Sequence, residues 1–210
     1  HGRIDGLRRK SSMSMKPTIL IIPGLRDHME AHWQTHLAKE LPNCVTVPPL
    51  EQDKLSCQAR LDAIDRALDR IDGPVLIVAH SAGCMMVAHW ALRRARPILG
   101  ALLAAPADVE TQMPAGYPTK DVLADNGWTP IPRQRLPFPT LLAASSNDPL
   151  TQLDRARRFA NDWGSHLVEL GPVGHLNPAS GHGHWPEAQQ LIQDLLAQIE
   201  AQQTEPAAQG

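Results

Sequence analysis

The 210-residue chain has few cysteines, no excess of one charge sign and no long apolar run. Its three cysteines are odd in number and form no CxxC pair, so we expect no disulfide scaffold and a reducing, cytoplasmic location. Lysine and arginine total 20 against 22 aspartates and glutamates, which gives no electrostatic footprint for nucleic acid or an anionic membrane. No run approaches the ~18 apolar residues of a membrane helix, so we expect no membrane span.

What is present fits one globular domain. Hydrophobic residues make up 42% of the chain and charged residues 20%, enough for a sizeable core. Residues 1–15 are basic but lack the apolar stretch of a secretory signal, so we interpret them as a flexible arm outside the fold. Residues 201–210, rich in Gln, Ala and Pro, are interpreted as a flexible tail. The predicted domain is therefore 16–200.

Two patterns alternate along this domain. Short unbroken apolar runs predict strands buried on both faces, and segments with helical apolar spacing predict helices. The predicted strands are Thr18–Ile22, Cys44–Val47, Val75–Ala79, Ile98–Ala104, Thr140–Ala144 and His166–Leu170. The predicted helices are Glu30–Leu41, Ser56–Ile71, Ala82–Arg94, Thr151–Trp163 and Pro186–Ile199. This order predicts an α/β fold, a mostly parallel six-stranded sheet with helices on both faces, whose site lies at the carboxyl ends of the strands.

The run Val75–Ala79 leads into His80-Ser81-Ala82-Gly83 and then a helix. A serine between a buried strand and a helix, with small residues two positions before and after it, is typical of a nucleophile elbow. The usual G-x-S-x-G pattern has alanine in its first position here, Ala79. The alternative reading of Ser81 is a helix-capping serine in an ordinary loop.

A nucleophilic serine needs an imidazole base and an acid that orients it. Asp148 follows the strand Thr140–Ala144, and His175 follows the strand His166–Leu170 in a glycine-rich loop. The order Ser81, Asp148, His175 is the order of these groups in α/β-hydrolases. We therefore predict that these three residues are the catalytic ones.

Alternatives exist for two of these roles. Asp148 could instead be the N-cap of the following helix, and Asp108 is a rival acid one strand earlier. His182 and His184 are rivals of His175, although they precede the last helix rather than follow a strand.

The oxyanion of the transition state needs two backbone donors. The N–H of Ala82 follows the serine, and the N–H of Leu25, after Gly24, is the natural second donor in the loop after the first strand. Three apolar residues are assigned to an acyl pocket: Trp33, Met86 and Leu150.

A metal site is not expected. His28, His32 and His36 are spaced to share one helix face, but the H-E-x-x-H pattern is missing and no cysteine or carboxylate completes a ligand set. No cofactor is predicted either.

Together these motifs resemble the small retinoblastoma-binding-protein-type serine hydrolases, the YdeN-like branch of the α/β-hydrolases. The resemblance rests on Pro23–Leu25, the segment from Asp27 to Trp33, Ala79–Cys84, Ser146–Pro149 and Gly174–Asn177. It implies a three-layer α/β-hydrolase-like fold without a large lid domain, and the same three catalytic residues. Physiological substrates of this family are poorly defined. The L-x-C-x-E motif of retinoblastoma binding ends in Ala59 instead of glutamate, so no such partner is expected.

The predicted function is a serine hydrolase that cleaves small carboxylic esters through an acyl-enzyme. Cleavage of amides or thioesters is an alternative. A second alternative is a binding or regulatory module with little or no turnover, of which the missing glycine at Ala79 would be a sign.

Overall fold

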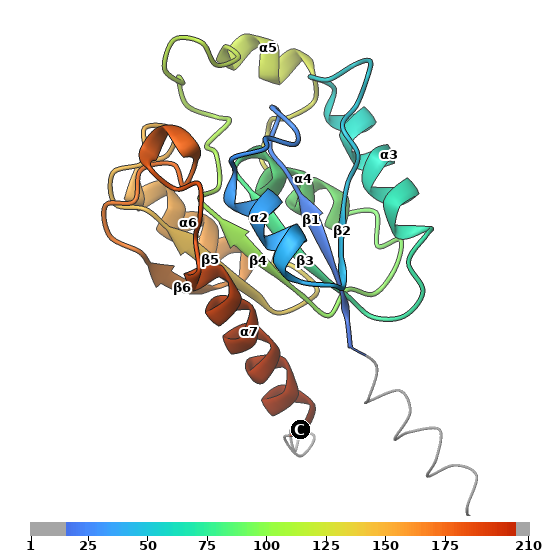
Figure 1. Ribbon diagram of the computed structural model, residues 1–210. Helices are drawn as coiled ribbons and strands as arrows, with labels where there is room; N and C mark the ends of the chain where they lie inside the picture. The colour runs from blue at the N-terminus through green and yellow to red at the C-terminus, as the bar shows by residue number, and fades with distance from the viewer. Residues whose placement is uncertain (1–15, 205–210) are drawn as a thin grey trace, which may run out of the picture.

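The computed structural model describes residues 16–204, which form a six-stranded sheet with helices on both faces (Figure 1). The strand order is β2-β1-β3-β4-β5-β6, and every neighbouring pair is parallel. The strands are β1 (Thr18–Ile22), β2 (Cys44–Thr46), β3 (Val75–His80), β4 (Gly100–Ala104), β5 (Thr140–Ala144) and β6 (His166–Glu169). The predicted α/β architecture is confirmed, and the sheet is parallel throughout.

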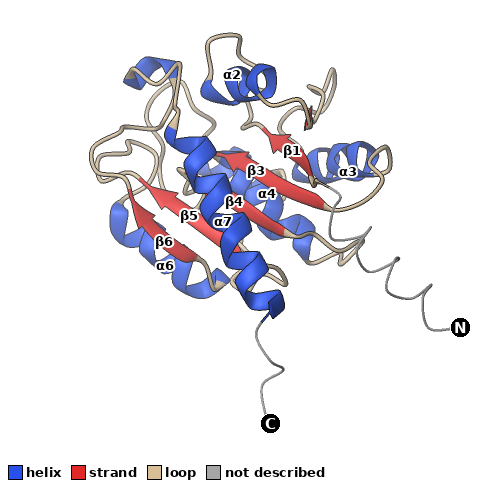
Figure 2. Cartoon of the chain, turned by 60° about the horizontal axis from the view of Figure 1, so that its bottom comes forward, coloured by secondary structure: helices blue, strands red, loops and turns tan. Residues whose placement is uncertain are grey.

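Helices cover both faces of the sheet and make three layers (Figure 2). The helices are α2 (Trp33–Glu40), α3 (Cys57–Leu68), α4 (Ala82–Ala91), α5 (Lys120–Asp125), α6 (Leu153–Trp163) and α7 (Glu187–Thr204). Apolar side chains of α3, α4 and α6 pack with one set of strand residues, and those of α2 and α7 pack with the alternate set. Because successive strand residues point to opposite faces, the continuous apolar runs supply both cores.

Local signals explain where the helices begin and end. Ser56 is the N-cap of α3, and its side chain accepts a hydrogen bond from the N–H of Ala59 at 3.1 Å. Gly164, with φ 72°, ends α6 in the left-handed conformation that glycine tolerates.

The last helix is longer than the sequence pattern indicated. Residues 201–204, assigned to the tail, continue α7 to Thr204. Alanine and glutamine favour helix, and the first proline after Ile199 is Pro206, so nothing before it stops the helix. Residues 1–15 and the rest of the predicted tail lie outside the described residues.

The connection between β4 and β5 carries α5, which lies at the top of Figure 1. Four side chains of this connection are buried in the main core: Val109, Leu123, Trp128 and Ile131. The connection is therefore part of the same domain. No large lid is present among residues 16–204, as expected.

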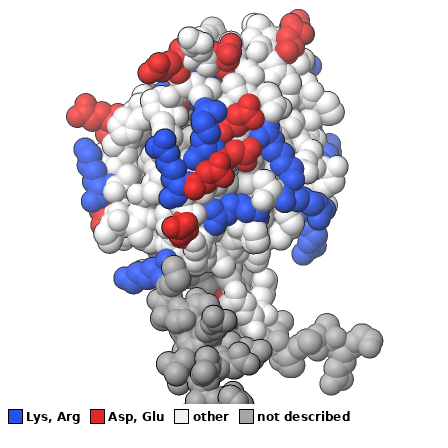
Figure 3. All heavy atoms as spheres, turned by 90° about the vertical axis from the view of Figure 1, so that its right-hand side faces the viewer, with Lys and Arg blue, Asp and Glu red and all other residues white. Residues whose placement is uncertain are grey.

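Charges of both signs are mixed on the face that carries α3 (Figure 3). The guanidinium of Arg93 pairs with two carboxylates of α3, Asp62 at 3.1 Å and Asp65 at 2.5 Å. No helix within 16–204 is both long enough and apolar enough to cross a membrane.

Candidate active site

Ser81 occupies a strained turn between β3 and α4. Its φ of 60° and ψ of −126° lie in a region that a residue with a side chain rarely adopts. The turn is held by β4, because the N–H of Ser81 donates to the carbonyl oxygen of Ala104 at 3.1 Å and its carbonyl accepts from Ala107 at 3.2 Å. The Ser81 side chain caps no helix, so the capping alternative is not observed.

Small neighbours are needed at this turn. A Cβ on Gly83 would lie 2.5 Å from the carbonyl oxygen of Ile22, which no real contact permits. A Cβ on Gly24 would lie 3.3 Å from the Cβ of Ser81. Ala79 stands in the strand itself and is fully buried there. Glycine is therefore required two residues after the serine, whereas alanine is accommodated two residues before it.

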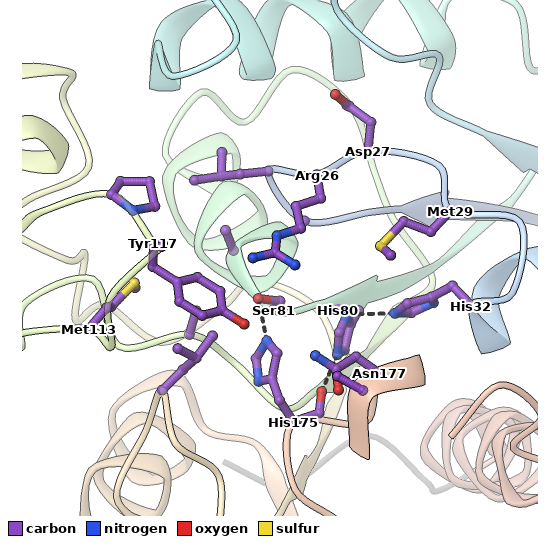
Figure 4. A pocket seen from close by; sticks show the side chains of 18 of the residues that line it. Arg26, Asp27, Met29, His32, His80, Ser81, Met113, Tyr117, His175 and Asn177 are labelled. Carbon is purple, nitrogen blue, oxygen red and sulfur yellow. Dashed lines mark hydrogen bonds between the residues drawn. The ribbon is translucent and has the colours of Figure 1, made fainter. Parts of the chain in front are cut away.

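The structure brings Ser81, His175 and Asp148 into one hydrogen-bonded line. The Nε2 atom of His175 lies 2.8 Å from the Oγ atom of Ser81 (Figure 4). Its Nδ1 atom lies 3.0 Å from both carboxylate oxygens of Asp148. The side chains of His175 and Asp148 are only 6% and 3% exposed. The carboxylate therefore holds the Nδ1–H tautomer and leaves the Nε2 lone pair for the hydroxyl proton.

Backbone donors fix the acid and its loop. Oδ1 of Asp148 accepts from the N–H of Leu150 at 2.9 Å, and the side chain of Asn147 accepts from the N–H of Gly174 at 2.7 Å. The second contact ties the loop of the acid to the loop of His175. Gln152, not Asp148, is the N-cap residue of α6.

The rival side chains lie elsewhere. Asp108 is fully buried and bound by the guanidinium of Arg155. His182 contacts Ser180, and Nε2 of His184 lies 3.4 Å from the carboxylate of Glu40.

The two expected oxyanion donors both line the pocket beside Ser81. Ala82 is the first residue of α4, and the first N–H groups of a helix have no partner within it. Leu25 follows Gly24, which lies against the serine. Among residues 16–204, the N–H groups of Leu25 and Ala82 have no acceptor in the loops and caps.

A cavity of about 260 Å³ opens in front of Ser81. Of the three residues assigned to it, Leu150 lines the cavity and Trp33 and Met86 do not. Met86 belongs to α4, is 2% exposed and packs in the main core. Trp33 is 1% exposed and packs on the other face of the sheet, where its indole N–H donates to the carbonyl oxygen of Leu176 at 3.0 Å. Residues that the sequence did not point to supply most of the apolar wall: Met29, Leu55, Val109, Met113 and Tyr117.

Two further histidines stand behind His175 and were missed by the sequence reasoning. Nε2 of His32 lies 3.1 Å from Nδ1 of His80, and Nε2 of His80 lies 2.7 Å from the carbonyl oxygen of His175 (Figure 4). Burial, reinforced by the nearby His175, lowers the pKa of His32 to about 4 and that of His80 well below 6.5. Both imidazoles are therefore neutral near pH 7.

The hydrogen bonds at the two ends of this histidine chain (His32, His80 and the carbonyl oxygen of His175) determine the tautomer of each ring. The N–H of Gln34 donates to Nδ1 of His32, so the proton of that ring is on Nε2 and is donated to His80. His80 must then carry its proton on Nε2, where the carbonyl oxygen of His175 can only accept. Both ends give the same assignment.

The three histidines that raised the question of a metal are used differently. His32 is the N-cap of α2 and bonds to His80, whereas His28 precedes the helix and contacts Thr35. The ring of His36 packs against that of His184. No group of three or more potential metal ligands was found in the part of the chain that the structure describes.

Comparisons with known proteins agree with this fold. A family model described as serine hydrolase matches residues 19–194. A YdeN-like hydrolase from Pectobacterium atrosepticum is 29% identical, with a TM-score of 0.76 over 92% of this chain and 97% of that chain. The ydeN gene product from B. subtilis is 16% identical, with a TM-score of 0.64 over 87% of this chain and 100% of that chain. No curated protein matches the chain.

A more distant likeness is to Est1E from Butyrivibrio proteoclasticus, whose structure has ferulic acid bound. It is 13% identical, with a TM-score of 0.64 over 87% of this chain and 90% of that chain. At that identity the likeness shows the fold alone. The resemblance to YdeN-like α/β-hydrolases inferred from the motifs is confirmed by the family model and the first two structures.

Proposed function

The chain belongs to the serine hydrolase family, and on that premise we propose that it cleaves small carboxylic esters with Ser81 as the nucleophile. His175 is the general base and Asp148 orients it. The observation that carries the proposal is the 2.8 Å contact between His175 Nε2 and Ser81 Oγ, in line with the Asp148 contact at Nδ1.

In the first step His175 takes the hydroxyl proton as Ser81 Oγ attacks the ester carbonyl carbon. The negative charge that develops on the carbonyl oxygen is stabilised by the N–H groups of Leu25 and Ala82. His175 then gives the proton to the leaving alcohol, and the acyl group stays on Ser81.

Water completes the cycle. His175 removes a proton from the water, whose oxygen attacks the acyl-enzyme, and the carboxylic acid leaves as Ser81 regains its proton. Asp148 stabilises the imidazolium that forms twice in each cycle.

The size of the cavity favours small substrates. At about 260 Å³ it lies near the lower end of ligand pockets, and Val109, Met113 and Leu150 give it an apolar wall. A short acyl chain or a single ring fits such a space.

An active-site label tests the proposal. We expect a fluorophosphonate probe to label the folded wild-type protein on Ser81 and not to label Ser81→Ala. Ser146→Ala is the matched control, because Ser146 is exposed in the loop of Asp148 and should leave labelling unchanged. No labelling of the folded wild-type protein would support the binding-module alternative instead.

Substrate class is resolved by a panel of p-nitrophenyl esters from acetate to octanoate, run beside the matching anilides and thioesters. We expect Ser81-dependent turnover to be fastest on the short esters. Faster turnover of the anilides or thioesters would contradict the ester assignment without contradicting Ser81 as the nucleophile.

A further inference from the structure

Arg26 carries the one charge in the pocket lining that has no ion-pair partner among residues 16–204. Asp27, the other charged residue of the lining, is paired with the buried guanidinium of Arg60. His32 and His80 also line the pocket, and their lowered pKa values keep them neutral. The positive charge of Arg26 is therefore available to a ligand.

The side chain of Arg26 points into the pocket that contains Ser81. Its Cζ atom lies 4.9 Å from the ring centroid of Tyr117, and Figure 4 shows its guanidinium reaching into the pocket above Ser81. Stacking on an aromatic ring uses the flat face of the guanidinium and leaves the N–H edge free for hydrogen bonds.

The loop that carries Arg26 is anchored on both sides. The N–H of Asp27 donates to the carbonyl oxygen of Gly24 at 3.0 Å, and Asp27 has a φ of 57°. Arg60 holds that conformation through the Asp27 carboxylate and through the carbonyl oxygen of Leu25, 3.1 Å away. The backbone of Arg26 is therefore held in place, next to Leu25, whose N–H is the proposed oxyanion donor.

We propose that Arg26 binds a carboxylate of the substrate, so the preferred substrates are short esters that carry one negative charge. The planar fork of a guanidinium matches the two oxygens of a carboxylate. The apolar wall of Val109, Met113 and Leu150 would contact the carbon chain between that carboxylate and the ester. This inference rests on the proposed esterase activity of Ser81.

Matched ester pairs test this inference. For a carboxylate on the acyl side, the p-nitrophenyl monoester of glutaric acid is compared with p-nitrophenyl valerate. For a carboxylate on the alcohol side, 4-carboxyphenyl butyrate is compared with 4-carbamoylphenyl butyrate. We expect wild type to prefer the charged member of one pair, and Arg26→Gln to lower kcat/KM for that ester on the order of 10- to 100-fold.

Two variants act as controls. Arg26→Lys keeps the charge without the fork and should retain part of the preference. Arg158→Gln removes an exposed charge from α6 and should change nothing. A wild type that hydrolyses neutral and charged esters equally, with no effect of Arg26→Gln, would overturn the role of Arg26. Absence of Ser81-dependent hydrolysis of every ester in the wild-type protein would contradict the proposed function itself.

A separate observation concerns how His175 is held. The tripeptide His32-Trp33-Gln34 is bonded, directly or through His80, to three main-chain segments around the site. Trp33 donates to the carbonyl oxygen of Leu176, which has a φ of 49°. The Gln34 amide donates to the carbonyl oxygens of Ile22 at 3.2 Å and Val78 at 3.3 Å, on β1 and β3. His32 reaches the carbonyl oxygen of His175, the residue before Leu176, through His80.

We infer that His32 and His80 are positioning residues that fix the main chain of His175. Neither imidazole is hydrogen-bonded to Ser81 or Asp148. His80 contacts His175 at its carbonyl oxygen and at its ring, with the two ring centroids 4.9 Å apart, and His32 acts through His80. The tautomers of both rings are fixed by their outer partners, and each of the four ring nitrogens has a hydrogen-bond partner. The two rings therefore have a single hydrogen-bonded arrangement. A displacement of about 1 Å at a reacting group can cost on the order of 100-fold in rate.

The test separates positioning from general loss of structure. His80→Leu removes the N–H that donates to the carbonyl oxygen of His175. In His80→Gln the side-chain amide can still donate to that oxygen. We expect His80→Leu to lower kcat about 10- to 100-fold with little change in KM, and His80→Gln to recover most of it. Urea unfolding establishes that both variants are folded during the assay.

Folded His80→Leu with the wild-type kcat would overturn this role, as would equal loss in both variants. A rise in KM alone would contradict it as well, because it would indicate a defect in binding rather than in the orientation of His175.

Discussion

Asp148 and Asp108 are two buried carboxylates that follow neighbouring strands, β5 and β4, yet they meet different partners. Asp148 faces the imidazole of His175 at 3.0 Å. Asp108 is bound by Arg155, with 2.7 Å to Nε and 2.9 Å to a terminal nitrogen. Hydrogen bonds with Asp108 raise the pKa of Arg155, so that guanidinium never releases its proton, whereas an imidazole can. The partner, rather than the place at the strand end, separates the proposed site for proton transfer from a structural ion pair.

The surroundings of the two carboxylates differ in the same way. Asp108 belongs to an ion-pair network in which Arg155 also binds Glu110 at 2.8 Å and Arg133 binds Glu110 and Asp162. This network ties the β4–β5 connection to α6. Asp148 has no charged partner of this kind among residues 16–204, and its carboxylate is directed to His175.

Asp148→Asn should give the largest effect. An asparagine amide can donate to Nδ1 of His175, which would move the ring proton to Nε2 and block acceptance from Ser81. We expect kcat for a short p-nitrophenyl ester to fall about 10⁴-fold while the protein stays folded. A fall of less than tenfold would contradict the role of Asp148.

Asp108→Asn is the matched variant and should reverse the pattern. It leaves Arg155 without its nearest anion, so we expect the free energy of unfolding to drop by about 2 kcal/mol, a value reduced because Arg155 is 22% exposed. Activity per folded molecule should stay within a few-fold of wild type. Urea unfolding and ester hydrolysis on the same samples measure both, and a loss of kcat as large as that of Asp148→Asn would reject the comparison.

The sequence predicts the fold well because parallel strands buried on both faces need continuous apolar runs. All six predicted strands are found, the weak ones Cys44–Val47 and His166–Leu170 included. The order of Ser81, Asp148 and His175 along the chain was informative because each follows a strand whose carboxyl end meets the same edge of the sheet.

The pocket was predicted less well, for physical reasons. Met85 and Met86 lie in a helix that is buried almost all round, so apolar spacing cannot tell which side chain faces the substrate. Trp33 was assigned to the pocket for its apolar surface, but its indole N–H needs an acceptor and finds one at Leu176.

The histidine chain had no sequence signal of its own. His32 and His80 are 48 residues apart, and no periodicity indicates that two such rings will share a hydrogen bond. The only available clues were the position of His80 directly before Ser81 and the place of His32 in the motif that carried the family resemblance.

Acid should further distinguish the surroundings of Asp148 and His175, which include His32, from the ion-pair network of Asp108, which includes Glu110. Burial lowers the pKa of His32 from 6.5 to about 4, so the unfolded chain binds more protons than the folded one between these values. Stability from this region is complete above pH 6.5 and falls as the pH drops toward 4. At Glu110, burial raises the pKa, but Arg155, the N–H of Ile131 and Arg133 outweigh it and lower the pKa below 4.5. The stability that Glu110 contributes is therefore present above pH 4.5 and is lost as the pH falls below it.

The measurement is urea unfolding at intervals from pH 7.5 to 4.5. We expect His32→Gln to make the fall in stability below pH 6.5 less steep, with the contribution of His80 remaining, and Glu110→Gln to leave that fall unchanged. An unfolding free energy that declines as steeply in His32→Gln as in wild type would show that acid sensitivity in this range arises elsewhere.

Leu150 contacts both carboxylate residues, Asp148 and Asp108, and its substitution gives the smallest predicted effect. Its N–H donates to Asp148, its carbonyl oxygen accepts from the N–H of Asp108 at 3.4 Å, and its side chain lines the cavity. Because both hydrogen bonds use the main chain, Leu150→Ala should keep them and enlarge only the pocket. We expect the ratio of kcat/KM for octanoate over butyrate esters to rise about 3- to 10-fold. Leu153→Ala removes the same side chain just outside the lining and should leave the ratio unchanged, so a shift in both variants would mean that pocket shape is set by the packing of α6 rather than by Leu150.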